Sequence, residues 1–114
     1  MEFSDRRVGN VVIVNLAGKA TFGAPGLDLH QIVAGLLDRG ERNVLLDMTG
    51  VGYMDSGGLG DLVGSFVKMS RRNGQLKLVN LGDKHRYLLE LTGLIDVIPS
   101  FSDEAEAVAS FDID

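Results

Sequence analysis

The longest regular pattern of hydrophobic and polar positions lies in the middle of the chain. Residues 44–46 (Val-Leu-Leu) form a short apolar run that is typical of a strand buried on both faces. A turn broken by glycines is expected next, followed by a helix that ends at Gly74. The predicted buried stripe of this helix recurs at i, i+3, i+4, i+7 and i+8: Leu59, Leu62, Val63, Phe66 and Val67. Its opposite, polar face carries Asp61, Ser65, Lys68 and Arg72.

Two strands and a helix are predicted before this segment. Residues 2–8 and 11–17 indicate the strands of a hairpin, joined at Gly9-Asn10, a pair suited to a tight turn. Residues 18–26 contain three glycines and a proline, and they predict a loop that carries one aromatic side chain, Phe22. A helix is expected from Pro25 to Gly40. Its predicted buried stripe is Leu29, Ile32, Val33, Leu36 and Leu37.

Shorter elements follow the central segment. Residues 75–81 predict a strand, and a short helix capped by Asp83 is expected next, with Tyr87, Leu88 and Leu91 as its apolar residues and Gly93 at its end. Residues 97–98 predict a short strand closed by Pro99. Ser102 is expected to cap a final helix, and residues 112–114 are expected to fray.

The order of elements is therefore ββαβαβαβα, which favours a single α/β domain over residues 1–114. Strands that alternate with helices predict a mostly parallel sheet with right-handed crossovers. We expect a sheet of about five strands, with the first hairpin as an antiparallel edge and the helices packed on the sheet.

Composition and charge exclude several classes of function. The chain has no cysteine, a formal net charge of −5 and a pI near 4.9, so neither a thiolate metal site nor binding to a nucleic-acid backbone is expected. No apolar run approaches the roughly 18 residues of a membrane span, and no leader is apparent. His30 and His85 have no second ligand at metal-like spacing. A cytoplasmic domain that binds proteins, without metal or cofactor, is the expectation.

Candidate chemistry centres on Ser56, which the pattern places at or beside the N-cap of the central helix. The segment Asp-Ser-Gly-Gly (residues 55–58) resembles the nucleophile segment of trypsin-like proteases, but those enzymes need two β-barrels, which the flanking helical periods contradict. The nucleophile elbow of α/β-hydrolases has Gly two residues before the Ser, where this chain has Met54. Only His30 or His85 could serve as the base, and neither has a recognisable orienting partner. An enzyme is therefore not expected.

The glycines after Ser56 also suggest part of a dinucleotide-binding fingerprint. Gly58-Leu59-Gly60 follows a strand and precedes a helix, but the next glycine is Gly64, one residue too far for that pattern. The interpretation favoured over ligand contact is that these glycines allow close packing between helix and strand.

The third possibility is a phosphorylation switch at Ser56. A phosphate group there adds about −1.5 to −2 charges. The helix dipole and the free first-turn N–H groups would accept it, whereas Asp55 would repel it, so we expect the fold to survive. A partner that buried this patch would then bury an uncompensated charge, which costs several kcal/mol. At about 1.4 kcal/mol per tenfold change in affinity, that cost is enough to abolish binding.

Residues 45–48 (Leu-Leu-Asp-Met) and 51–60 (Val-Gly-Tyr-Met-Asp-Ser-Gly-Gly-Leu-Gly) are similar to the signature of STAS domains, specifically of bacterial anti-sigma-factor antagonists. The turn of that family reads Asp-Ser-Ser-Gly-Leu-Gly. Residues 16–18 (Leu-Ala-Gly) and 91–94 (Leu-Thr-Gly-Leu) extend the likeness. The resemblance implies that Ser56 is phosphorylated by an anti-sigma factor that is itself a serine kinase. The unphosphorylated protein would bind this anti-sigma factor and release a sigma factor, and a PP2C-type phosphatase would reset it.

Two departures from the family pattern affect the expected site. Gly57 stands in place of the usual second Ser, which leaves Ser56 as the acceptor. The loop that commonly reads Gly-x-Leu-Asp is Gly-Lys-Ala-Thr here, so Thr21 replaces an acid of the partner surface. Thr21 and Thr49 are secondary candidates for phosphorylation. The expected partner-binding residues are Asp55, Ser56, Gly57, Gly58, Leu59, Thr21, Phe22, Asp61 and Lys68. The alternative is a STAS subunit of another assembly, such as a lipid-transport ABC complex or a signalling scaffold.

Overall fold

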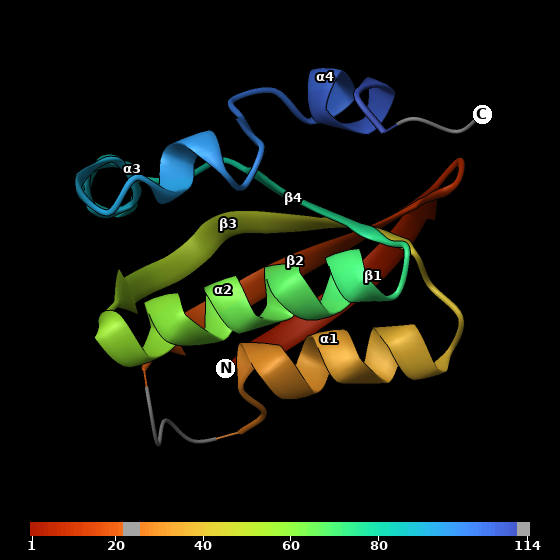
Figure 1. Cartoon of the computed structure of the whole chain (residues 1–114), viewed down its shortest axis with the longest axis horizontal. Helices are drawn as coiled ribbons and strands as arrows, with labels where there is room; N and C mark the ends of the chain where they lie inside the picture. Colours follow the sequence, from red (N-terminus) through yellow and green to blue (C-terminus); the bar gives the residue numbers. More distant parts are fainter. Residues whose placement is uncertain (22–25, 112–114) are drawn as a thin grey trace.

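The computed structural model describes residues 1–21 and 26–111, which form one mixed five-stranded sheet with helices on both faces. The strands lie side by side in chain order, with β1 antiparallel to β2 and all other neighbours parallel (Figure 1). Their bounds are β1 Glu2–Val8, β2 Val11–Ala20, β3 Asn43–Met54, β4 Gln75–Val79 and β5 Ser100–Phe101. The predicted α/β architecture with an antiparallel edge hairpin is confirmed.

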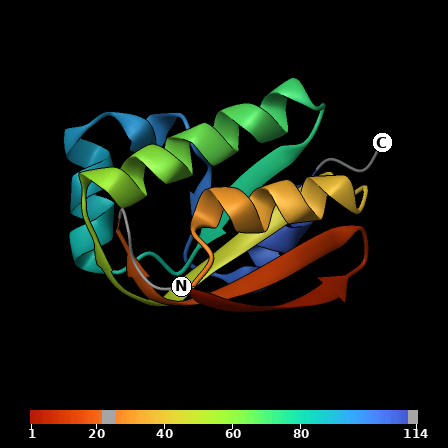
Figure 2. The same ribbon diagram turned by 90° about the horizontal axis from the view of Figure 1, so that it is seen from below.

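The helices form two layers of unequal size. They are α1 Leu29–Asp38, α2 Ser56–Arg71, α3 Asp83–Leu91 and α4 Glu104–Ala109, with a short 3-10 helix, η1, at Leu94–Asp96. Figures 1 and 2 show α1 and α2 side by side on one face of the sheet and α4 on the other. The larger core lies beneath α1 and α2, and a smaller one lies beneath α4.

The buried stripe of α1 is confirmed, but its predicted start at Pro25 is wrong. All five stripe residues are buried, and Gly40, with φ +88°, follows the helix end as expected. The helix begins at Leu29 because Asp28 caps it. The Asp28 carboxylate accepts a hydrogen bond from the Gln31 N–H at 2.8 Å, and the Gln31 side chain accepts one from the Asp28 N–H at 2.9 Å. This capping box fixes the first turn.

The predicted turn within residues 47–54 is wrong, because β3 continues to Met54. β2 likewise continues beyond the predicted 11–17, to Ala20. The β2–β3 register shifts twice along this stretch, which is the mark of bulges. A Cβ atom on Gly50 would lie 2.4 Å from the Leu16 carbonyl oxygen, so this glycine serves a close approach of strands instead of a turn. Both strands thus reach the edge of the sheet where α2 begins.

The buried stripe of α2 differs from the predicted one. Gly58, Leu62, Ser65 and Met69 are buried, whereas Val67 is 38% exposed. The Ser65 hydroxyl has no hydrogen-bond partner among the described residues. The prediction placed Val67 in the buried stripe because valine is hydrophobic and serine is polar. The position of each residue around the helix axis decides which one faces the core, and Ser65 occupies that position.

The end of α2 is a Schellman motif with Asn73 in the left-handed position. Asn73 has φ +60°, and its N–H donates to the Ser70 carbonyl at 3.2 Å. The Gly74 N–H donates to the Met69 carbonyl at 2.7 Å. Gly74 therefore lies one position beyond the residue that turns the chain.

The predicted details of α3 are also corrected. Gly82, instead of Asp83, occupies its N-cap position, and no side chain caps the helix. Asp83 is the first helical residue. Tyr87 and Leu91, expected on its apolar face, are 62% and 66% exposed, whereas His85 and Leu89 are buried. The helix is too short and too near the edge of the sheet for periodicity to determine which side is covered.

Beyond α3, the predicted strand at residues 97–98 is wrong, because Val97 closes η1 and the strand is Ser100–Phe101. Asp103, instead of Ser102, caps α4, accepting a hydrogen bond from the Glu106 N–H at 3.0 Å. The strand predicted over 75–81 ends at Val79. Residues 112–114, expected to fray, lie outside the described residues.

Candidate functional site

Ser56 is the first residue of α2, directly after the N-cap residue Asp55. The Asp55 carboxylate accepts a hydrogen bond from the Gly58 N–H at 3.0 Å, which leaves the first-turn amides of Ser56 and Gly57 without an intrahelical acceptor. Ser56 is exposed to solvent. Its predicted place at or beside the N-cap is confirmed, and its hydroxyl can be reached from outside.

Two backbone contacts fix this turn against the end of β2. The Asp55 N–H donates to the Ala20 carbonyl oxygen at 3.2 Å. A Cβ atom added to Gly58 would lie 1.8 Å from that same oxygen, a distance that no side chain can occupy. The interpretation of Gly58 as a close-packing residue is therefore confirmed. Gly60 has no such constraint, because its Cβ position has nothing within 4 Å.

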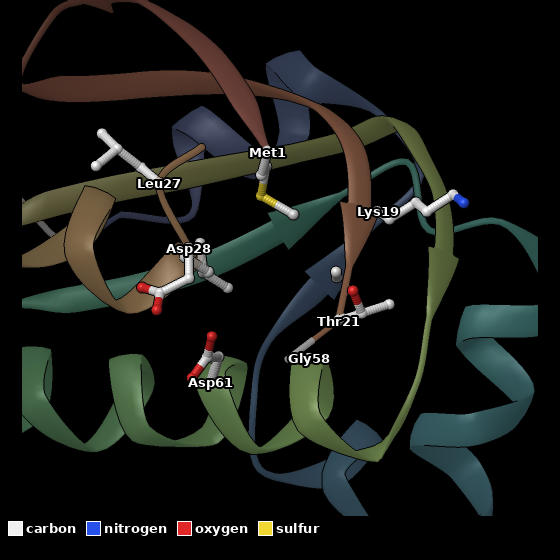
Figure 3. A pocket seen from close by; sticks show the side chains of 9 residues that line it. Met1, Lys19, Thr21, Leu27, Asp28, Gly58 and Asp61 are labelled. Carbon is white, nitrogen blue, oxygen red and sulfur yellow. The ribbon is translucent and has the colours of Figure 1, made fainter. Parts of the chain in front are cut away.

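A small pocket lies beside this contact, between the end of β2 and the first turns of α1 and α2 (Figure 3). Thr21, Gly58 and Asp61 line it together with Asp28, and its volume is about 10 Å³. That is close to the minimum for a single water molecule. The pocket next to the glycines is thus far too small for a nucleotide.

Two carboxylates from different helices face each other at this pocket (Figure 3). Asp28 is exposed at the N-cap of α1, and Asp61 is half-buried on α2. Burial raises the pKa of the Asp61 carboxyl above its ordinary value of 3.8, the Asp28 carboxylate raises it further, and His30 lowers it in part. The surface beside Thr21 therefore carries negative charge.

Sequence reasoning missed Asp28 as a member of this site. The signal available was the capping-box pattern Asp28-x-x-Gln31, which would have placed the start of α1 correctly. Its approach to Asp61 depends on how α1 packs beside α2, and no local pattern carries that information.

The structure brings only some of the predicted site residues together. Thr21, Gly58 and Asp61 share the pocket, and Asp55, Ser56 and Gly57 form the adjoining turn. Leu59 is half-buried and packs against the core. Lys68 lies two turns further along α2 than Asp61, in a separate groove. Phe22 lies outside the described residues.

Among the described residues, neither histidine is bonded to Ser56. His30 is exposed on α1, near Gly64 of α2, and no hydrogen bond joins Ser56 to either histidine in the described part of the chain. His85 is buried on α3, and burial lowers its pKa. Within residues 1–21 and 26–111, no group of three or more His, Cys, Asp or Glu side chains could hold a metal ion.

Comparison with known proteins identifies the family to which this fold belongs. The family model described as the STAS domain matches residues 2–107. The chain belongs to the STAS domain family. Among the described residues, no STAS-domain helix combines the length and the hydropathy that a membrane span requires.

Relatives of this STAS domain include named regulators. It is 39% identical over 80 residues to the anti-sigma-B factor antagonist of Listeria monocytogenes, a match that covers 70% of this chain and 65% of that protein. It is 37% identical over 90 residues to the anti-sigma-B factor antagonist of Bacillus subtilis, covering 78% and 80%. The fold matches that of the Bacillus cell fate determinant SpoIIAA in its phosphorylated form, with a TM-score of 0.68, 21% identity, and 95% and 97% coverage.

We expect Gly58→Ala to lower the free energy of unfolding by about 1–3 kcal/mol, because the added methyl group overlaps the Ala20 carbonyl oxygen. The matched control is Gly60→Ala in the same turn, where nothing lies within 4 Å. This control should raise the free energy of unfolding by up to about 1 kcal/mol through helix propensity. Urea denaturation measures both. Equal effects of the two substitutions would contradict the close contact.

A second expectation concerns pH. The folded-state pKa of Asp61 is raised, so the folded protein binds this proton more tightly than the unfolded chain. Ionisation of Asp61 therefore destabilises the fold as pH rises from 3.8 through the raised pKa, and the loss is complete at neutral pH. Asp61→Asn should be more stable than the parent protein at pH 7, and this difference should shrink as the pH falls. A difference that is constant with pH would contradict the assignment.

Proposed function

We propose that this STAS domain is an anti-sigma-factor antagonist whose binding surface is switched by phosphorylation of Ser56. In its unphosphorylated form it binds an anti-sigma factor that is a serine kinase, and a sigma factor is released. The observation that carries the proposal is the exposed hydroxyl of Ser56 at the start of α2, in a chain whose relatives are named anti-sigma factor antagonists.

The Ser56 turn can accept a phosphate group without rearrangement. The first-turn amides and the positive end of the α2 dipole face the position of the added anion. The Asp55 carboxylate repels the phosphate, but it already accepts a hydrogen bond from the Gly58 N–H at 3.0 Å. Asp55 and Gly58 also hold the turn against Ala20, so the phosphate changes the charge of the surface while the backbone stays in place.

The effect on binding follows from desolvation. A partner surface that covers neutral Ser56 would have to bury about two negative charges after phosphorylation. Burying a charge without a partner costs several kcal/mol, and each 1.4 kcal/mol is about tenfold in affinity. Phosphorylation is therefore sufficient to release the partner.

The remaining roles follow from this proposal. The protein is the substrate of the kinase and contributes binding instead of catalysis, and a PP2C-type phosphatase restores the free hydroxyl of Ser56. Gly57 leaves a single acceptor in the turn. The proposed contact surface comprises residues 55–59, Thr21 and Asp61. Lys68, also predicted for it, lies in a separate groove, and Phe22 lies outside the described residues. The proposed partners place the protein in the cytoplasm.

We expect Ser56→Asp to keep the circular dichroism spectrum of the parent protein and to weaken binding of the serine-kinase anti-sigma factor by at least about 100-fold. Ser56→Ala should bind with the affinity of the unphosphorylated protein and should keep that affinity after incubation with the kinase and ATP. Calorimetry with the purified anti-sigma factor measures both.

The matched control is Ser102→Asp, which adds the same charge beside the N-terminus of a different helix, α4, at another exposed serine. It should bind like the parent protein. Binding of Ser56→Asp and Ser56→Ala with equal affinity would contradict the switch.

A further inference from the structure

A groove lies along the solvent side of α1 and α2, away from the Ser56 turn. It has a volume of about 540 Å³ and is lined by His30 of α1 and by Gly64, Val67, Lys68, Arg71 and Arg72, from the middle to the C-terminal end of α2. The two helices that form it run side by side over the same face of the sheet (Figure 2). None of these residues belongs to the pocket beside Gly58.

Charge distinguishes this groove from the rest of the molecule. The chain has a net charge of −5, yet the cationic side chains of Lys68, Arg71 and Arg72 line this groove together. Among the described residues, no carboxylate lies within 4.0 Å of the side-chain nitrogens of Lys68, Arg71 or Arg72, whereas Arg6, Arg7 and Arg39 form ion pairs elsewhere. The negative end of the α2 dipole favours cations at this position but leaves their side chains free to bind an anion.

The floor of the groove is apolar, and at Gly64 no side chain rises from it. Val67 is 38% exposed there, and Gly64 has no side chain, so that even an added Cβ atom would meet only the His30 Nδ1 at 4.0 Å. A polyanion such as a nucleic acid or a lipid headgroup would use the cations but would leave Val67 and Gly64 uncovered. An amphipathic helix uses both features, since it places apolar and acidic side chains on neighbouring stripes.

We propose that this groove binds an acidic amphipathic helix of a partner protein, with its apolar stripe on Gly64 and Val67 and its carboxylates over Lys68, Arg71 and Arg72. The proposal goes beyond the function assigned to Ser56, because it requires neither phosphorylation nor an anti-sigma factor. The residue that is switched, Ser56, lies 15 residues before Arg71, which is about 22 Å of helix, so the two sites are centred near opposite ends of α2.

The charges at the two ends of the groove also set the direction of the bound helix. Asp61 lies about one turn before Gly64, and Asp28 lies two residues before His30, so negative charge borders one end of the groove and positive charge the other. The acidic end of the partner helix lies over Arg71 and Arg72. Because these charges are exposed, binding weakens as salt is added.

The experiment is a titration of the ¹⁵N-labelled full chain with a synthetic helix of about three turns, with leucine on one stripe and glutamate on the neighbouring one. Saturable shifts are expected for the amides of residues 64–72. Lys68→Glu/Arg71→Glu/Arg72→Glu should weaken binding by at least about tenfold. The matched control, Lys84→Glu/Arg86→Glu on α3, should not change it. Val67→Ser should also weaken binding, and it tests the apolar contact without any change of charge.

Further probes separate this site from the alternatives. A peptide with lysine in place of glutamate should not bind, and Ser56→Asp should bind the acidic peptide like the parent protein, which separates the groove from the phosphorylation switch. Equal shifts with anionic phospholipid vesicles, or with a glutamate peptide that lacks leucine, would overturn the proposal in favour of a nonspecific anion surface. Absence of saturable shifts with the acidic helix would overturn it as well.

Discussion

The carbonyl oxygen of Ala20 determines where the helix that carries Ser56 can begin. It accepts the Asp55 N–H at 3.2 Å and lies against Gly58 at a distance that excludes any side chain. The last residue of β2 and the first turn of α2 therefore form one rigid unit. Asp55 then caps the helix from within this unit, and Ser56 projects from it into solvent. A hydroxyl held in this way can change its charge while its support stays unchanged.

The α2 helix separates two kinds of surface along its length. Its first turns carry Ser56 and the carboxylate of Asp61, which faces Asp28 of α1, and its last turn carries a group of cations. Electrostatic interactions between exposed groups decay over roughly 8–10 Å at physiological salt. A phosphate at the start of the helix therefore has little influence on an acidic segment bound near its end. One helix can thus carry a contact that phosphorylation controls and a second contact that phosphorylation leaves unchanged.

The order of elements along the chain and the stripe of α1 could be predicted from sequence because both depend on local periodicity. The continuation of β3 through Gly50 could not, since a glycine that admits the Leu16 carbonyl looks the same in sequence as a glycine in a turn. The burial of Ser65 in place of Val67 depends on how α2 is rotated against the sheet and α1. Within the candidate site, the place of Ser56 followed from its own motif, whereas Asp28 required the packing of two helices.

The central claim is that phosphorylation of Ser56 changes the surface and not the fold. Amide hydrogen exchange, measured by NMR before and after complete phosphorylation by the kinase, tests it directly. We predict that chemical shifts change for residues 55–61 and for their neighbours Ala20, Thr21 and Asp28, while protection of β3 and of the later turns of α2 is unchanged. Loss of protection along β3 or through the whole of α2 would show that the phosphate unfolds its support, and would contradict this account.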